Sequence, residues 1–177
     1  MTPRKITFLI AIPCVLILAA LCAYAVPQTK ERAPRFNAKT MDGEKFTNET
    51  TKGKVVLLEF WTTWCPYCFT EAPFVDKINR EYSDKGLLVL TINVGESKKT
   101  VKKYLEQHPR TTRIILTDDT NLAAMYEAVE YPIYVVIDKN GNIAATQRGA
   151  AGEEALREML ATAGIGPKDE SESQSAR

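Results

Sequence analysis

The chain of 177 residues is long enough for one ordinary domain with short extensions, because domains usually contain about 100–200 residues. Its hydrophobic fraction of 45% and charged fraction of 25% are those of an average globular protein, which excludes a collagen-like or wholly disordered chain. The net charge is +1 and neither sign forms long blocks, so we expect no nucleic-acid partner.

Residues 1–26 are predicted to be an N-terminal signal-anchor, a transmembrane segment. Arg4 and Lys5 precede an apolar run over residues 6–26, and about 20 apolar residues are enough to cross a bilayer as a helix. The basic residues before the run favour an orientation with the domain outside the cytoplasm. The Ala-Tyr-Ala triplet at residues 23–25 also suits cleavage of a signal peptide, which would release a soluble domain. Both readings export the domain to an extracytoplasmic space.

One domain is expected between two polar extensions. Residues 27–34 carry a proline at either end and should form a linker. Residues 166–177 are small, polar and charged, and should form a disordered tail. The folded domain is therefore predicted to cover residues 35–165.

The first predicted elements lead to a pair of cysteines. Residues 36–40 and 45–47 flank an Asp-Gly dipeptide suited to a tight turn, which predicts a small hairpin. Residues 54–61 form a nearly continuous β-prone apolar run, typical of a strand covered on both faces. Apolar residues then recur at helical spacing from Cys65 until a Lys-Gly pair ends the segment at residue 86.

The rest of the domain alternates between strands and helices. Predicted strands cover residues 87–94, 113–117, 133–138 and 142–149, and predicted helices cover residues 97–108, 121–129 and 152–163, the first with Ser97 as its N-cap. Alternating elements followed by a hairpin predict an α/β fold of three layers, with a mixed central sheet between helices.

Cys65 and Cys68 lie on the first turn of a predicted helix, where they can close a small disulfide ring or present a thiolate. Unpaired backbone N–H groups and the helix dipole favour an anionic sulfur at the first position, so Cys65 is the expected nucleophile. Cys68, one turn further in, is placed to attack a mixed disulfide and is the expected resolving cysteine. Pro66 suits the first helical turn because its φ is fixed. Trp61 and Trp64 precede the pair and should form an apolar rim for a partner's backbone; a place in the core is the alternative, above all for Trp61.

The sequence WCPYC after a buried strand resembles the active site of the thioredoxin superfamily. The stretches GKVVLLEFWTTWCPYCFTEAP, LLVLTINVGESKKTVKKYL and YPIYVVIDKNGNI are similar to the membrane-anchored, extracytoplasmic TlpA/ResA-like thiol-disulfide oxidoreductases. The similarity covers about residues 34–163. It implies a thioredoxin-like α/β/α sandwich with an added N-terminal β-hairpin.

The resemblance also implies roles for residues outside the cysteine pair. Pro132 matches the family's cis-proline beside the dithiol, and the backbone of Tyr131 would pair with an extended substrate. Glu59 matches a buried acid that takes and returns protons beneath the dithiol, although a strand-end residue facing solvent would fit the pattern too. Glu71 matches an acid near the active-site cavity, with a solvated helix surface as the alternative.

The residues between the cysteines, Pro66 and Tyr67, are expected to contact the substrate. This pair differs from those commonest in the subgroup, so the sequence leaves the redox potential and direction open. Family membership implies disulfide reduction in exported cysteine-containing proteins, such as apocytochrome c or copper-site proteins, with electrons from a membrane dithiol donor. We expect no bound metal and no organic cofactor.

Other roles of the cysteine pair have less support. A Cu(I)-binding metallochaperone on a thioredoxin fold is an alternative because two thiolates suit Cu(I), but the only histidine, His108, is expected at a helix end. A thiol peroxidase is a weaker alternative: Thr62 lies three residues before Cys65, but Leu58 occupies the place of the expected proline. A structural disulfide this short would constrain little of the chain, and a zinc site would need more ligands.

Overall fold

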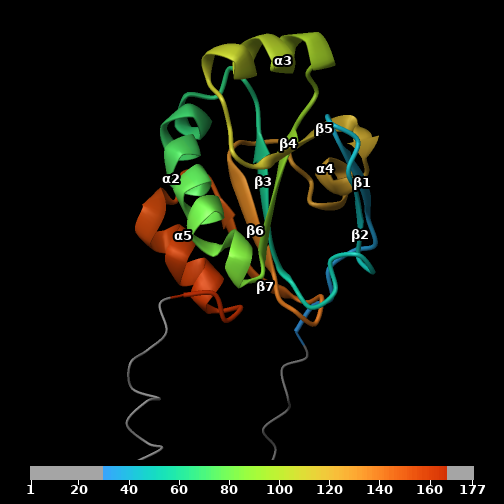
Figure 1. Ribbon diagram of the computed structural model, residues 1–177, viewed down its shortest axis with the longest axis vertical. Coiled ribbons are helices and arrows are strands. Elements are labelled where there is room, and N and C mark those ends of the chain that lie inside the picture. The colour runs from blue at the N-terminus through green and yellow to red at the C-terminus, as the bar shows by residue number, and fades with distance from the viewer. Residues whose placement is uncertain (1–29, 167–177) are drawn as a thin grey trace, which may run out of the picture.

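The computed structural model describes residues 30–166, which form one mixed seven-stranded sheet with helices on both faces (Figure 1). The strands are β1 Asn37–Thr40, β2 Lys45–Thr47, β3 Val55–Trp61, β4 Leu87–Asn93, β5 Arg113–Thr120, β6 Ile133–Ile137 and β7 Ile143–Arg148. The helices are α2 Pro66–Tyr82, α3 Lys98–Gln107, α4 Leu122–Met125 and α5 Gly152–Ala161, with a short 3-10 helix η1 over Ser83–Lys85. The strand order is β2-β1-β5-β4-β3-β6-β7.

The predicted membrane segment lies outside the described residues, as does the expected tail after Gly166. Among residues 30–166, no helix combines the length and the apolar composition needed to cross a membrane.

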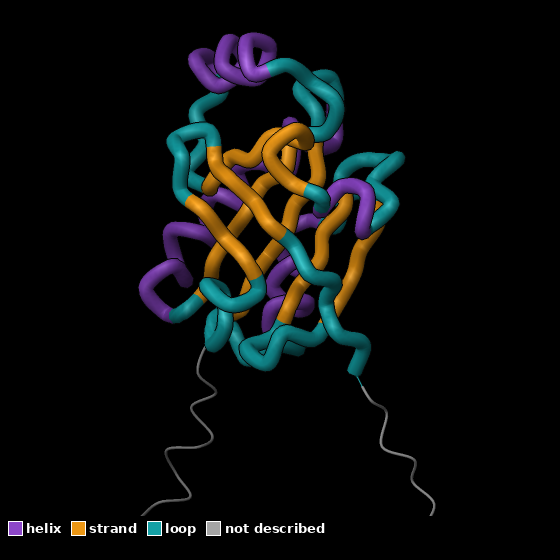
Figure 2. Tube along the Cα trace, turned by 90° about the vertical axis from the view of Figure 1, so that its right-hand side faces the viewer, coloured by secondary structure: helices purple, strands orange, loops and turns teal. Residues whose placement is uncertain are grey.

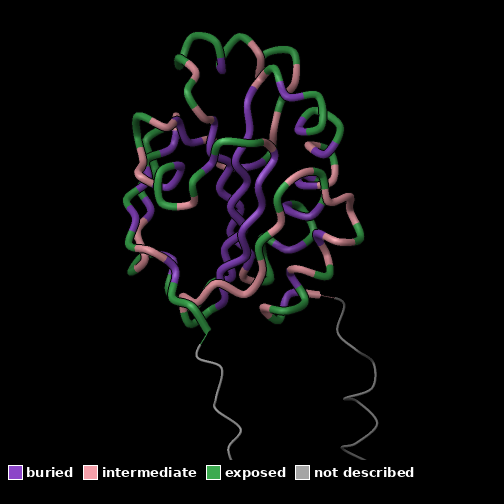
Figure 3. The backbone as a smooth tube through the Cα atoms, turned by 180° about the vertical axis from the view of Figure 1, so that it is seen from behind, coloured by how far each residue is buried: buried purple, intermediate pink, exposed green. Residues whose placement is uncertain are grey.

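Strands β3 and β4 form the buried centre of the sheet. All seven residues of each strand are buried, and Figure 3 shows this buried centre from behind. Strand β3 is parallel to β4 and antiparallel to β6. Because layers on both faces exclude water, the two segments read as continuous apolar runs rather than alternating ones. The strands predicted at residues 54–61 and 87–94 are thus confirmed.

Neighbouring residues of β3 point to opposite layers. Val55 and Leu57 pack with α2 and α5, whereas Val56 and Leu58 pack with α4 and with the N-terminal segment around Phe36. Helices α2 and α5 lie side by side on one face of the sheet (Figure 1). The predicted thioredoxin-like three-layer fold is confirmed, including the added hairpin of β1 and β2.

Helix α3 lies over one end of the sheet, as Figure 2 shows. Its buried residue, Val101, packs with Trp61, Cys65 and Cys68. The predicted N-cap is confirmed, because the Ser97 side chain accepts a hydrogen bond from the Thr100 N–H at 3.2 Å. Helix α3 is therefore part of the wall around the cysteine pair.

Helix α4 and strand β5 differ in length from the sequence prediction by several residues. The helix predicted over residues 121–129 ends at Met125, because Glu127 adopts a left-handed backbone conformation with φ of 49°. The strand predicted over residues 113–117 continues to Thr120, which pairs with Ala38 of β1. Pairing with a distant segment extends this strand through residues that are not apolar.

Residues within the expected linker lie against the domain. The Ala33 N–H donates to the Gly141 carbonyl at 3.0 Å, and the Glu31 carbonyl accepts from the Ile143 N–H at 2.7 Å. The structured chain therefore begins before Arg35, because these residues pair with the turn between β6 and β7.

Candidate redox site

Cys65 and Cys68 form a disulfide at the N-terminus of α2. Cys65 is the N-cap, and its Sγ accepts a hydrogen bond from the Cys68 N–H at 3.0 Å. Pro66 occupies the first turn, where a missing N–H costs no helical hydrogen bond. The two cysteines are 4% and 2% exposed, so little of either residue is open to a partner. Backbone N–H groups at this position stabilise negative charge, which favours a thiolate on Cys65 after reduction.

The peptide bond between Tyr131 and Pro132 is cis, as predicted. It directly precedes β6, the antiparallel neighbour of β3, which is the strand leading to Cys65. Tyr131 packs against the cluster that contains both cysteines. Among the described residues, the backbone N–H and C=O of Tyr131 take part in no hydrogen bond. This backbone is free to pair with an extended segment of another chain.

Exposed aromatic side chains surround the disulfide. Trp64 is 68% exposed and Tyr67 63% exposed, although aromatic residues of this size are usually buried. The ring of Trp64 meets the ring of Tyr131 edge-on, with their centroids 5.8 Å apart. Trp61, by contrast, is 1% exposed and belongs to the core. The site therefore has an apolar rim over buried sulfur, in the place where the sequence predicted one.

Glu59 is fully buried in β3, on the same face of the strand as Leu57 and Trp61. Its Oε2 accepts a hydrogen bond from the Arg110 guanidinium at 2.8 Å, whereas its Oε1 has no partner among the described residues. The alternative of a strand-end residue facing solvent is wrong. Arg110 also donates to Asp76 of α2 at 3.0 Å.

Two carboxyl groups thus share one buried guanidinium. Asp76 accepts three hydrogen bonds on its carboxylate, one from Arg110 and two from Thr111, whereas Glu59 accepts one. A negative charge on Glu59 is therefore incompletely compensated. Burial raises the pKa of Glu59 above its ordinary value, and the neighbouring Arg110 opposes only part of this effect. Glu59 is therefore suited to hold a proton inside the buried core.

The sequence gives no sign of Arg110 as a partner of Glu59. A buried carboxyl group needs a partner, but local pattern does not say which of 23 basic residues supplies it. Arg110 lies 51 positions further along the chain, in the loop that follows α3. Its guanidinium also lies 5.9 Å from the ring centroid of Trp61. A single residue thus links the acid, helix α2 and the core aromatic below the cysteines.

Glu71 is buried at 3% exposure, so the alternative of a solvated helix surface is wrong. Its carboxylate accepts hydrogen bonds from the Tyr134 hydroxyl at 2.7 Å, from the Ala151 N–H at 3.0 Å and from the Gly152 N–H. The last two groups belong to the N-terminus of α5, where a carboxylate satisfies otherwise unpaired donors. Glu71 therefore joins α2 to α5.

The loop before the cysteines is held by Glu96, which the sequence analysis did not single out. Its carboxylate accepts hydrogen bonds from the Thr63 N–H at 2.7 Å and from the Asn93 side chain at 2.7 Å. The Thr63 hydroxyl donates to its other oxygen at 2.5 Å. These bonds fix the turn that delivers Trp64 and Cys65 to their positions.

His108 caps the C-terminus of α3, in agreement with the prediction. Its ring lies 5.2 Å from the ring of Phe69 and 4.7 Å from the ring of Tyr104, measured between centroids. Within residues 30–166, no three His, Cys, Asp or Glu side chains are grouped so as to hold a metal ion.

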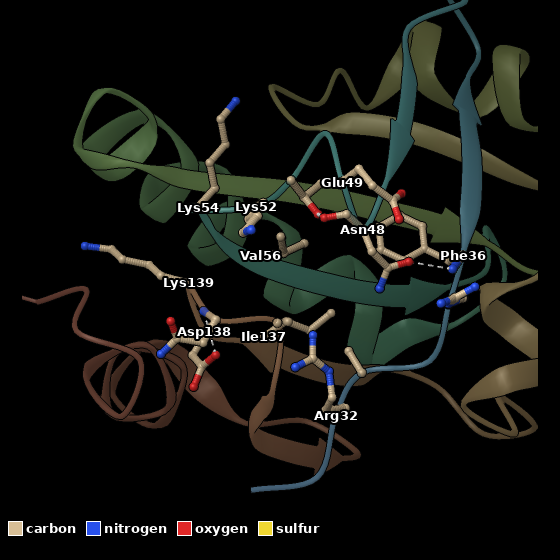
Figure 4. Close-up of a pocket in the computed structure, with 15 residues that line it drawn as sticks. Arg32, Phe36, Asn48, Glu49, Lys52, Lys54, Val56, Ile137, Asp138 and Lys139 are labelled. Atoms are coloured by element: carbon tan, nitrogen blue, oxygen red, sulfur yellow. Dashed lines mark hydrogen bonds between the residues drawn. The ribbon is translucent and has the colours of Figure 1, made fainter.

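A basic cavity lies at the opposite end of β3 from the disulfide (Figure 4). It is lined by residues of the N-terminal segment, of the loop before β3 and of the β6–β7 turn, including Arg32, Lys52 and Asp138. Figure 4 shows the side chains of Lys54 and Lys139 extending away from it. This cavity is not part of the redox site.

Comparisons with known proteins agree with this geometry. The chain matches the Redoxin family over residues 28–162. It is 34% identical over 136 residues to the thioredoxin-like protein YneN of Bacillus subtilis (strain 168), covering 75% of this chain and 79% of that protein. It is 30% identical over 128 residues to the thiol-disulfide oxidoreductase ResA of Geobacillus thermodenitrificans (strain NG80-2), covering 72% of this chain and 74% of that protein.

The fold is similar to that in the crystal structure of StoA from Bacillus subtilis. The TM-score is 0.63 at 25% identity, over 72% of this chain and 96% of that chain. The family match covers more than half of the chain, and it includes the cysteine pair and the cis-proline. The chain belongs to the Redoxin family, as a TlpA/ResA-like member of the thioredoxin superfamily.

Proposed function

We propose that this thiol-disulfide oxidoreductase reduces disulfide bonds in exported proteins. The observation that carries the proposal is the disulfide at the N-terminus of α2. It is flanked along the chain by the exposed Trp64 and Tyr67, and its cluster packs against Tyr131, whose backbone takes part in no hydrogen bond among residues 30–166. A structural disulfide does not need a surface on which another chain can bind. An enzyme that forms a mixed disulfide needs such a surface beside its cysteines.

In the reduced enzyme, the Cys65 thiolate attacks one sulfur of a client disulfide. The client S–S bond breaks, its second sulfur leaves as a thiolate, and a mixed disulfide forms with Cys65. Cys68 then loses its proton and attacks the Cys65 sulfur, which releases the client's remaining thiolate and closes the Cys65–Cys68 disulfide. Two electrons have passed to the client, so the enzyme must be reduced again by another dithiol.

Glu59 is proposed as the group that takes the proton from Cys68 when Cys68 attacks. Two observations support this role. Burial raises the pKa of Glu59, so the carboxylate readily accepts a proton, and its Oε1 has no hydrogen-bond partner among the described residues. Glu71 is proposed as a positioning residue, which holds α2, the helix that begins at the cysteines, against Tyr134 and the start of α5. The negative charge of Glu71 also favours the protonated form of Glu59, since it contributes to the raised pKa.

The client is proposed to bind as an extended segment across the rim. The backbone of Tyr131 would pair with it, while Pro132 stands beside the disulfide at the start of the next strand. Trp64, Pro66 and Tyr67 are exposed around the sulfurs and would contact its side chains.

The cellular setting is part of the proposal. The apolar run at residues 6–26 is proposed to anchor the domain outside the cytoplasm, with cleavage and release as the alternative. A membrane dithiol protein would then supply electrons. The clients would include exported proteins whose cysteines must be reduced before they bind a cofactor, such as apocytochrome c or copper-site proteins.

The reduction potential of the cysteine pair tests the proposed direction. Full-length protein in detergent would be equilibrated with defined dithiothreitol or glutathione buffers, and the fraction of disulfide measured by mass. A potential near about −270 mV, like that of thioredoxin, is expected for a reductase. A value near about −120 mV would make the protein a disulfide donor and overturn this direction.

Trapping of the intermediate tests the roles of the two cysteines. Cys68→Ser should accumulate a mixed disulfide with a client peptide, because the group that resolves it is gone. Cys65→Ser should accumulate none, because the attacking sulfur is missing. The opposite pattern would reverse the assignment of nucleophile and resolving cysteine.

A further inference from the structure

A shallow groove lies along α3 and reaches Thr63 in the loop that precedes Cys65. Its lining consists of Thr63, Lys99, Thr100, Lys103, Tyr104 and Gln107, and it includes no acidic residue. Thr63 is two positions before Cys65 and next to the exposed Trp64. The groove therefore opens beside the place where a client must lie during exchange.

The face of α3 turned away from the domain is strongly basic. Four of its ten residues are lysines, and Glu106 is its only acid. Val101, Tyr104 and Leu105 pack with the cluster that contains the cysteines, so the lysines are left on the exposed side. Figure 1 shows α3 beyond the N-terminal end of α2, at the same end of the molecule as the disulfide.

Lys99 and Lys103 form no ion pair that would stabilise the described part of the fold. Glu96 is the nearest acid that the structure ties to this loop, and its carboxylate already accepts hydrogen bonds from Thr63 and Asn93. Two free cations thus flank a groove that continues the client-binding rim.

We propose that this groove binds an acidic segment of the client, so that the preferred clients carry Asp or Glu close to the cysteine that is attacked. The inference rests on the proposed client reduction and defines its substrate class. Complementary charges increase the rate of encounter and fix the register of a bound segment, and unmatched partners react more slowly. The aromatic rim is apolar and does not discriminate by charge, whereas the groove does.

Disulfide-bonded peptides that differ only in their flanking residues test the inference. Each peptide pair carries Asp-Asp, Ser-Ser or Lys-Lys beside the cysteine, on the N-terminal or the C-terminal side in separate sets. The second-order rate constant of reduction by the full-length, pre-reduced enzyme is measured at low and high ionic strength. When the flanking residues lie on the side of the cysteine that reaches the groove, the acidic peptide should react about tenfold faster than the neutral one at low salt. This ratio of rates should fall at high salt.

Variants assign the preference to the groove. Lys99→Glu/Lys103→Glu should abolish or reverse the ratio of acidic to neutral rates. The matched control Lys52→Glu/Lys54→Glu changes the same charge at the far end of β3 and should keep the ratio. Lys99→Gln/Lys103→Gln removes the cations without adding acids and should bring the ratio close to one. Taking the ratio of two peptides cancels any effect of the lysines on the reactivity of Cys65 itself.

The outcomes separate this inference from the proposed function. If the wild type reduces acidic and neutral peptides at equal rates, or if the ratio survives Lys99→Glu/Lys103→Glu, the inference is wrong while client reduction stands. If no peptide of any charge is reduced, the proposed reductase function fails and the inference fails with it.

Discussion

Arg110 donates a hydrogen bond to Glu59 at 2.8 Å, and both side chains are almost completely buried, at 4% and 0% exposure. The same guanidinium binds Asp76 of α2, so it joins the strand before the cysteines to the helix that carries them. Because of this pairing, both the charge of the buried Glu59 and the position of α2 depend on a residue from a distant loop.

Glu59→Gln should change how stability depends on pH. Because burial raises the pKa of Glu59, folding favours the protonated carboxyl group. The stability contributed by that proton is complete below the ordinary glutamate pKa near 4.5 and is lost as the pH rises through the higher folded-state value. Glutamine stays neutral throughout, so the unfolding free energy of the variant should increase relative to the wild type across this window.

Urea unfolding of the two proteins at a series of pH values measures this difference. Groups that do not interact with Glu59 contribute equally in both proteins and cancel, so the difference reports Glu59 together with its coupling to Arg110 and Asp76. Two curves that run parallel through the whole range would show that the carboxyl group does not gain a proton on folding.

Arg110→Met should destabilise the fold strongly, because it leaves two buried carboxyl groups without their shared cation. Removing one partner of a buried ion pair costs about 3–5 kcal/mol. Arg113→Met is a suitable control, since the Arg113 side chain is 38% exposed and binds Glu44 at the surface, where a pair contributes about 0–1 kcal/mol. Adding Glu59→Gln to Arg110→Met should restore part of the loss. Chemical unfolding measures all four proteins, and equal losses for the two arginine variants would contradict the buried network.

Glu71→Ala should lower stability by about 2–4 kcal/mol, because three donors lose their acceptor: the Tyr134 hydroxyl and two N–H groups at the start of α5. Glu154→Ala removes an exposed acid from the first turn of the same helix and serves as the control. The exchange rate of folded Glu71→Ala should stay close to that of the wild type if Glu71 acts through position. A large loss of rate with unchanged stability would instead support a catalytic role.

Trp64 and Trp61 should respond in opposite ways to truncation. Trp61→Ala empties a core position and should cost about 3–5 kcal/mol of unfolding free energy. Trp64→Ala removes a side chain that is 68% exposed, so stability should change by less than about 1 kcal/mol. Reduction of a protein client should nevertheless slow in Trp64→Ala, because the rim loses its largest apolar surface. Unchanged rates with a protein client would remove Trp64 from the binding surface.

The order of strands and helices could be predicted from the sequence, because each central element carries a local signal. Buried strands read as apolar runs, helices as a 3.6-residue repeat, and the hairpin turn as an Asp-Gly dipeptide. The redox pair could be predicted for the same reason, since Cys65 and Cys68 are neighbours on one helical turn. The cis bond before Pro132 was predicted by resemblance and is present.

Only the tertiary structure decided which groups pair with the buried charges. It also decided where elements end when their ends depend on distant segments. Arg110 reaches Glu59 across 51 positions, and Glu71 reaches α5 across 80 or more. Strand β5 extends to Thr120 through pairing with β1. A local pattern indicates which charged residue will be buried, but it does not indicate which group will compensate its charge. The compensating group is brought there by the packing of the whole chain.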